Sequence, residues 1–220
     1  MHRNVTRVAT AALLSATLVA ASAAGASASA PELVEAPATV VAEFEQHLES
    51  EGSASDVATY EALTEEQQAQ LVAVLTSPDP TSQPGVEIVE SRTVTSAPAR
   101  SALAGPSRSH SLNAVDRTSD WRIDAKMFGI TIGYFRQVFN YQTSSTAVVS
   151  SQKCRGTWTG FAGFWNISQV NSHYVTNGFG HCYTDFDLDV VFKGAAGGMN
   201  KEMYTKTSRY GMDAWHLINI

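Results

Sequence analysis

Apolar and polar residues alternate through the second half of this 220-residue chain. Residues 128–141 place apolar side chains on both faces of an extended segment, and residues 183–193 alternate Phe, Leu and Val with Asp. A two-residue period is typical of β-strands, and the Asn177-Gly178 pair is a hairpin signal. We therefore predict that residues 119–220 form an antiparallel β-sandwich or small barrel. The other strand candidates are residues 121–125, 147–151, 157–164, 174–175 and 215–220.

Residues 29–76 have the period of a helix instead. Apolar residues recur three or four positions apart, and Ser53 with Asp56 and Thr64 with Gln67 resemble capping boxes that start helices. Short helices with so few aromatic residues make a thin core. The segment is either a discrete module or an acidic spacer whose helices pack on the β unit.

Residues 77–118 look like a linker between these two units. They are rich in Pro, Ser, Thr and Ala, and they contain one strand-like piece at residues 86–95. We expect the rest of this segment to be mobile and open to proteases.

Charge divides the chain as sharply as periodicity does. Residues 31–90 contain thirteen carboxylates and no Lys or Arg, whereas residues 91–220 hold thirteen Lys and Arg against eight Asp and Glu, a net charge of +5. Opposite charges on one chain favour contact, because the tether raises their effective concentration. We expect the acidic segment to cover a basic surface of the β unit, which makes it a candidate pro-region.

The first 28 residues have the layout of a Sec-type signal peptide. Arg3 and Arg7 precede an apolar run over residues 8–21, and small residues follow, with a cleavage site expected after Ala28. The apolar run is short for a membrane span, so we expect no transmembrane span after cleavage. The sequence predicts a secreted, extracellular protein.

Secretion decides how the two cysteines are interpreted. Cys154 and Cys182 form the one available pair, and an oxidising compartment favours a disulfide over a free or catalytic thiol. The bridge would close a loop of 27 intervening residues, worth roughly 3 to 4 kcal/mol in the chain-entropy model.

One strand carries a row of carboxylates. Asp185, Asp187 and Asp189 fall on one face of residues 183–193, about 7 Å apart. Calcium is one candidate for neutralising such a row outside cells. The interpretation we favour is a solvated face, or ion pairs with Lys and Arg on neighbouring strands, and we expect no cofactor. The cations considered are Lys153, Arg155, Lys206 and Arg209.

Aromatic and histidine side chains supply the candidate binding residues, which are Trp158, Trp165, His173, Tyr174 and His181. Tryptophans near glycines either form a ligand-binding face or fill the core of a sandwich. If Trp158 is buried, Trp165 should point the other way unless a bulge intervenes, because the two are an odd number of residues apart.

No catalytic motif is present, so we assign no catalytic residues and expect a non-enzymatic protein that binds a cell-envelope or extracellular ligand. Nucleic acid is excluded as a partner, because residues 29–220 hold 13 Lys and Arg against 21 Asp and Glu, a net charge of −8, and no basic cluster. The layout is similar to that of many secreted proteins of actinobacteria. The alternatives are a secreted hydrolase made as a zymogen, with His173 or His181 as base, and a membrane-active protein held inactive by the acidic segment.

Overall fold

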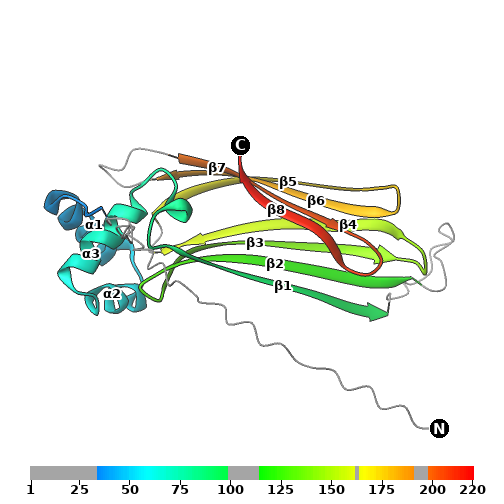
Figure 1. Ribbon diagram of the computed structural model, residues 1–220, viewed down its shortest axis with the longest axis horizontal. Helices are drawn as coiled ribbons and strands as arrows, with labels where there is room; N and C mark the ends of the chain where they lie inside the picture. Colours follow the sequence, from blue (N-terminus) through cyan, green and yellow to red (C-terminus); the bar gives the residue numbers. More distant parts are fainter. Residues whose placement is uncertain (1–33, 99–113, 162–163, 191–197) are drawn as a thin grey trace, which may run out of the picture. The chain divides into compact units, whose positions relative to one another are not determined.

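A computed structural model describes residues 34–98, 114–161, 164–190 and 198–220. Three helices come first in the chain, and eight antiparallel strands then form two four-stranded sheets (Figure 1). The helices are α1 (Ala38–Glu51), α2 (Ala54–Glu61) and α3 (Glu65–Leu75), followed by a 3₁₀ turn at Pro80–Ser82. The first sheet holds β1 (Glu87–Pro98), β2 (Val115–Met127), β3 (Ile130–Thr143) and β4 (Val148–Gly160). The second holds β5 (Trp165–Thr176), β6 (Phe179–Val190), β7 (Gly198–Thr207) and β8 (Met212–Asn219).

The predicted fold class is confirmed. Each strand pairs with its neighbour in sequence within its sheet, as in an up-and-down meander. The Asn177-Gly178 pair makes the predicted turn between β5 and β6, and both residues have the positive φ values, 50° and 78°, that such a turn requires. Phe128, which we placed in a strand, lies in the turn between β2 and β3 with φ 51°, because Gly129 after it completes a tight reversal.

Burial follows the predicted alternation along β6. Phe186 and Leu188 are buried, whereas the aspartates between and beside them are exposed. On β3, Phe135 and Phe139 point into the core together with Gln137, which is 2% exposed. The inner face of the sandwich therefore includes one amide among its aromatic rings.

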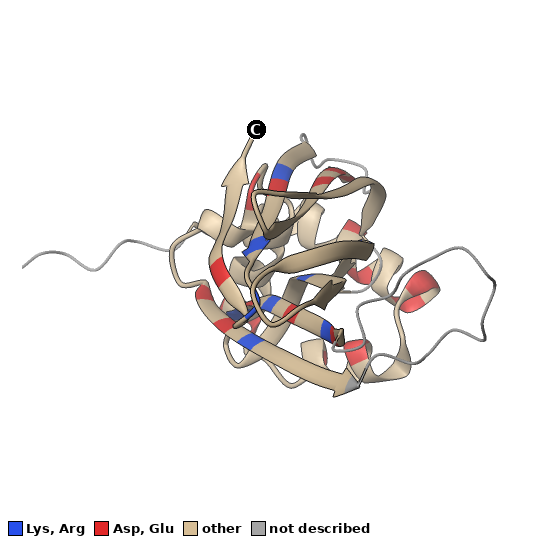
Figure 2. Cartoon of the chain, turned by 90° about the vertical axis from the view of Figure 1, so that its right-hand side faces the viewer, with Lys and Arg blue, Asp and Glu red and all other residues tan. Residues whose placement is uncertain are grey.

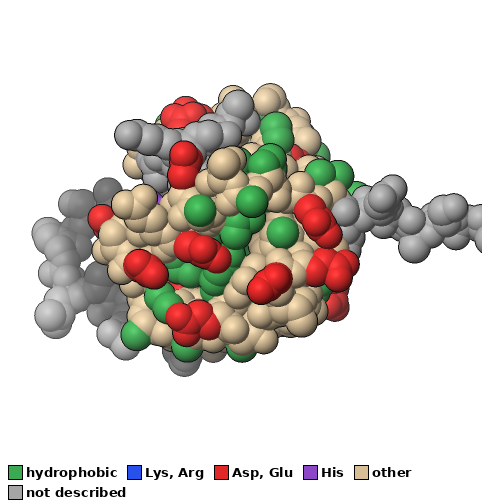
Figure 3. All heavy atoms as spheres, turned by 90° about the vertical axis from the view of Figure 1, so that its left-hand side faces the viewer, with side chains coloured by type: hydrophobic (Ala, Val, Ile, Leu, Met, Phe, Trp, Pro, Cys, Tyr) green, Lys and Arg blue, Asp and Glu red, His purple; other side chains and the backbone are tan. Residues whose placement is uncertain are grey.

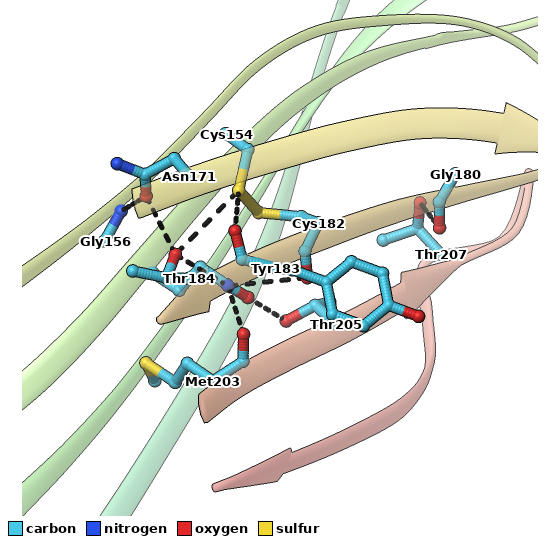
Figure 4. The surroundings of a disulfide bond; sticks show 11 residues. Cys154, Gly156, Asn171, Gly180, Cys182, Tyr183, Thr184, Met203, Thr205 and Thr207 are labelled. Atoms are coloured by element: carbon cyan, nitrogen blue, oxygen red, sulfur yellow. Dashed lines mark hydrogen bonds between the residues drawn. A yellow bond between two sulfur atoms is a disulfide. The ribbon is translucent and has the colours of Figure 1, made fainter. Parts of the chain in front are cut away.

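The disulfide joins the two sheets (Figure 4), and so do the hydrogen bonds of the Gln137 amide. Cys154 of β4 and Cys182 of β6 have Cα atoms 5.5 Å apart, which confirms the predicted bridge. Gln137 donates from Nε2 to the Met203 carbonyl at 2.8 Å and accepts from the Thr205 hydroxyl at 2.5 Å. All of the amide's polar atoms are thereby satisfied inside the core.

The helices pack on the ends of the strands through apolar contacts. Phe44 of α1 is fully buried and stacks on Phe164, at the turn between β4 and β5, with ring centroids 4.6 Å apart. Leu71 and Leu75 of α3 belong to the same buried cluster as Met199 and Met203 of β7. The core therefore extends from the helices into the sandwich.

Two boundaries of the predicted linker are wrong. Residues 87–98 form β1, which pairs along its whole length with β2, and β2 begins at Val115. The β-branched pattern at residues 86–95 was the local sign of this strand, but strand pairing needs a partner that the local pattern does not reveal. Residues 99–113 and the predicted signal peptide lie outside the described residues.

The acidic residues of the helices lie at the surface. Carboxylates and apolar side chains share the face that the helices present, and no Lys or Arg is visible there (Figure 3). The basic residues that the structure describes are found on the strands, interspersed with Asp and Glu, except for Arg209 in the turn between β7 and β8 (Figure 2). The contacts that attach the helices are mostly apolar, with one buried ion pair between Asp79 and Lys201.

The prediction that Trp165 points away from Trp158 is wrong. β4 ends at Gly160 and β5 starts at Trp165, so the two rings belong to different strands and both enter the core. Their centroids are 6.2 Å apart in an edge-to-face arrangement. The expectation failed because side chains alternate between the two faces only within one uninterrupted strand.

Candidate functional site

Strands β1 and β8 are outer strands of different sheets, and they lie side by side. The Arg92 guanidinium of β1 lies 3.7 Å from the centroid of the Trp215 ring of β8. Two residues further along β1, a methyl group of Val94 lies close to Gly211, the residue just before β8. The distance is 3.4 Å from this methyl group to the position that a Cβ on Gly211 would take. We call the depression between the two strands the seam groove.

The larger part of the seam groove is a cavity of about 410 Å³. Trp121 and Ile123 of β2 form its buried floor, and Trp215 and Leu217 of β8 form one wall. Ile88 of β1, 48% exposed, forms part of the rim. The remaining lining residues are Thr81, Glu90, Lys201 and His216.

The polar groups in this cavity are held in place by one another. Glu90 accepts a hydrogen bond from the Trp121 indole at 2.8 Å and pairs with Arg92 at 3.3 Å. Lys201, 5% exposed, donates to Asp79 at 2.7 Å. The cavity is thus an apolar surface with fixed polar groups at defined points, which is the usual composition of a ligand site.

A second cavity of about 310 Å³ lies on the other side of the Arg92–Trp215 pair. Its lining residues include Thr93 and Val94 of β1 and Met212 and Asp213 of β8. Tyr210, 75% exposed, stands at its edge. Trp215 lines both cavities, so its ring is the shared wall of the seam groove.

A row of neighbouring rings crosses the outer face of the second sheet. Tyr174 stacks on His181 with centroids 4.7 Å apart, and the Tyr183–Tyr204 and Tyr204–His216 pairs are tilted, with centroids 4.5 and 4.9 Å apart. We call these five residues the ring row. The spacing is close to that between adjacent strands, so the rings stand side by side with their faces covered.

The pKa values of three members of the ring row are shifted toward the neutral forms. Burial and the nearby Lys206 ammonium lower the pKa of His181, whose Nδ1 lies 2.9 Å from the Tyr204 hydroxyl. The hydrogen bond with Tyr174, followed by burial, raises the pKa of Tyr183, and burial raises that of Tyr204. His181, Tyr183 and Tyr204 therefore act as uncharged cross-strand packing, which stabilises a sheet.

The three aspartates lie where the sequence put them, exposed on the outer face of β6. Burial and the neighbouring Glu202 raise the pKa of Asp185. The register places Asn200 opposite Asp187 and Gly198 opposite Asp189, so these positions of β7 hold no cation. Within the described ranges, no three His, Cys, Asp or Glu residues are arranged to hold a metal ion, and the row gives no argument for calcium.

The structure separates the other predicted binding residues. Trp158 and Trp165 are buried in the core and are not available to a ligand. His173 lies on β5 opposite Cys182, which is the other face from Tyr174. Tyr174 and His181 do come together, in the ring row. His181 also lies on the opposite face of β6 from the hydroxyl of Thr184.

The residues of the seam groove were missed by sequence reasoning. Arg92 and Ile88 were assigned to a linker, and Trp215 and Leu217 to a terminal strand with no known neighbour. The two sides of the seam groove are more than 100 residues apart in sequence. Only the β-branched character of residues 86–95 hinted at the strand that forms one side.

No protein-family model, curated protein or solved structure matches this chain. The described helices include none that is both long and apolar enough to cross a membrane. Any function has to be argued from the site itself.

Proposed function

We propose that this chain is a secreted, non-enzymatic binding protein, and that the seam groove receives an apolar part of an extracellular or cell-envelope ligand. The observation that carries this proposal is the cavity of about 410 Å³ beside Trp121 and Trp215. Its volume lies in the usual range for ligand pockets, roughly 300 to 1,000 Å³. The fixed polar groups at Glu90 and Lys201 would orient the ligand while the indole rings bury its apolar part.

We propose further that the acidic helical segment remains part of the working protein. Thr81, directly after the helices, lines the cavity, and Asp79 binds the Lys201 ammonium that also lines it. A chain without this segment would lose part of the cavity wall and expose Phe164, on which Phe44 stacks. These contacts favour a role in building the site over the role of a removable cover.

The hydrolase alternative has less support. One of its two proposed bases, His181, is engaged with the Tyr204 hydroxyl and packed between Tyr174 and Tyr204. Neither histidine candidate lines the seam groove. The binding function is therefore the one that the geometry favours.

The test uses Nile red, an uncharged apolar dye, as the probe. We expect dye fluorescence to rise and shift to the blue when it binds the wild-type protein, and Ile88→Glu to weaken this binding about tenfold or more. A buried Ile side chain contributes about 1.5 to 3 kcal/mol, and 1.4 kcal/mol is a factor of ten in affinity. Because the dye carries no charge, the new carboxylate acts through its polarity alone.

Ile218→Glu is the matched control. Ile218 of β8 is 46% exposed, against 48% for Ile88, but it does not line the seam groove. Wild-type affinity in Ile218→Glu together with weak binding in Ile88→Glu would support the site. Equal affinities in the two variants would reject the seam groove as the binding site.

A further inference from the structure

The larger cavity of the seam groove has one buried cation in its wall. Lys201 is 5% exposed and lines this cavity, and its ammonium donates to Asp79 Oδ2 at 2.7 Å. Thr81 lines the same cavity, and its hydroxyl donates to the other oxygen of Asp79 at 2.6 Å. The charged end of the Lys201 side chain therefore lies at the part of the wall that Thr81 forms.

The Lys201 ammonium carries more N–H groups than this one bond uses. The bond to Asp79 is the only hydrogen bond that it forms with the described residues. A buried donor without an acceptor costs free energy, because its hydrogen bonds to bulk water are lost. An oxygen acceptor of a ligand at this wall would form a charge-assisted hydrogen bond with the ammonium.

The charges around this cavity are already paired with one another. Asp79 neutralises Lys201, and Glu90, which lines the cavity from β1, is paired with Arg92 at 3.3 Å. A carboxylate ligand would therefore add an unbalanced negative charge close to Asp79 and Glu90. Taking that charge out of water costs more than one hydrogen bond to the ammonium returns. An uncharged carbonyl oxygen forms the same hydrogen bond without this cost.

The rest of the lining is mainly apolar and limits the size of the ligand. At roughly 30 Å³ for a water-sized group, the cavity of about 410 Å³ holds on the order of a dozen non-hydrogen atoms. That is the size of a medium-chain acyl group with a small head. The apolar side chains available to it are those of Ile88, Trp121, Ile123, Trp215 and Leu217.

We propose that the seam groove binds an uncharged acyl compound, an ester or an amide. Its carbonyl oxygen accepts a hydrogen bond from Lys201, and its hydrocarbon chain lies over Trp121 and against Trp215. This inference rests on the proposed binding function and names the chemical class of the ligand. It assigns to Lys201 the role of the group that selects an uncharged head over an ionised one.

The test compares methyl octanoate with nonanoate, which contain the same carbon and oxygen atoms but differ in charge. Titration calorimetry at neutral pH measures both affinities on the wild-type protein, so this comparison needs no variant. We expect the ester to bind about tenfold more tightly or better, because only nonanoate brings a charge toward the cavity. Equal affinities, or tighter binding of nonanoate, would overturn the proposal.

The double variant Asp79→Asn/Lys201→Met tests the donor itself, because it removes the ammonium and its counter-charge together. We expect it to bind methyl octanoate about tenfold more weakly than the wild type, since the carbonyl oxygen loses a charge-assisted hydrogen bond. Lys206→Met is the matched control, because Lys206 lies on the same strand, β7, but does not line the seam groove. The same ester affinity in the double variant and in this control would reject Lys201 as the donor.

Failure of this inference can be told apart from failure of the proposed function. If Ile88→Glu weakens the binding of Nile red but the wild type does not prefer methyl octanoate over nonanoate, the seam groove binds ligands and the proposed ligand class is wrong. If Ile88→Glu and Ile218→Glu bind the dye equally, the seam groove is rejected as a site and this inference is rejected with it.

Discussion

The ion pair between Asp79 and Lys201 gives the sharpest test of how the helical segment is attached. Lys201 is on the inner face of β7, and its side chain is 7% exposed, whereas that of Asp79 is 18% exposed. Asp79 also accepts hydrogen bonds from the backbone and hydroxyl of Thr81, at 3.1 and 2.6 Å. Asp79→Asn keeps an acceptor for Thr81 and removes the counter-charge of the buried ammonium.

We expect Asp79→Asn to destabilise the protein by about 3 kcal/mol. Breaking a buried pair costs roughly 3 to 5 kcal/mol because an uncompensated charge remains, and the partial exposure of Asp79 favours the lower end. With an m-value of about 2 kcal/mol/M, the urea midpoint of the oxidised protein would fall by about 1.5 M. Glu61→Gln, an exposed carboxylate on α2, is the control and should change little.

Lys201→Met separates charge from packing. In the double variant Asp79→Asn/Lys201→Met neither partner is charged, so its stability should return to within about 1 kcal/mol of the wild type. A double variant that is as unstable as Asp79→Asn would refute the argument that the unpaired ammonium causes the loss. So would an Asp79→Asn midpoint equal to that of Glu61→Gln.

The ion pair between Asp79 and Lys201 also predicts how the stability of the protein changes with pH. Burial raises the pKa of Asp79, but the bonds from Lys201 and Thr81 outweigh it and leave the pKa below its ordinary value. A lowered pKa gives stability that is fully present above the unfolded value of about 3.9 and is lost as pH falls through the folded value. The difference in the free energy of unfolding between the wild type and Asp79→Asn should therefore be constant near neutral pH and shrink in acid.

Two further predictions concern the core and maturation. Gln137→Leu should lower the unfolding free energy by about 2 to 4 kcal/mol, because it leaves the buried Thr205 hydroxyl and Met203 carbonyl without their hydrogen-bond partner. Urea titrations measure this loss, and an unchanged midpoint would contradict the described network. The intact mass of protein from culture supernatant should start near Ser29 and gain two alkyl groups only after reduction, whereas a mass starting between about 95 and 119 would show that the helices are discarded.

Local periodicity predicted the parts of the fold that are decided locally. The capping boxes at Ser53 and Thr64 start α2 and α3, and the Asn177-Gly178 turn connects β5 with β6. The alternation on β6 also placed the aspartates correctly. In each case, the residues that decide the structure are within a few positions of one another.

Features that join distant segments were not predictable in this way. β1 needs β2 as its partner across residues 99–113, and the seam groove needs β1 and β8 to meet. The opposite net charges of the two halves favoured a cover held by attraction, but one buried pair and a large apolar contact attach the helices. Net charge over a long segment is a poor guide here, because exposed charges are screened and contribute little.

The ring row spans the second sheet from the seam groove to β5. His216 lines the seam groove at one end of the ring row, and Tyr174 lies on β5 at the other. Each cross-strand ring pair adds roughly 0.2 to 1 kcal/mol to the sheet, so the ring row stiffens the four strands behind the seam groove. A stiff sheet holds Trp215 and Leu217 in position as a cavity wall. The rings of the outer face therefore need no ligand of their own to explain their presence.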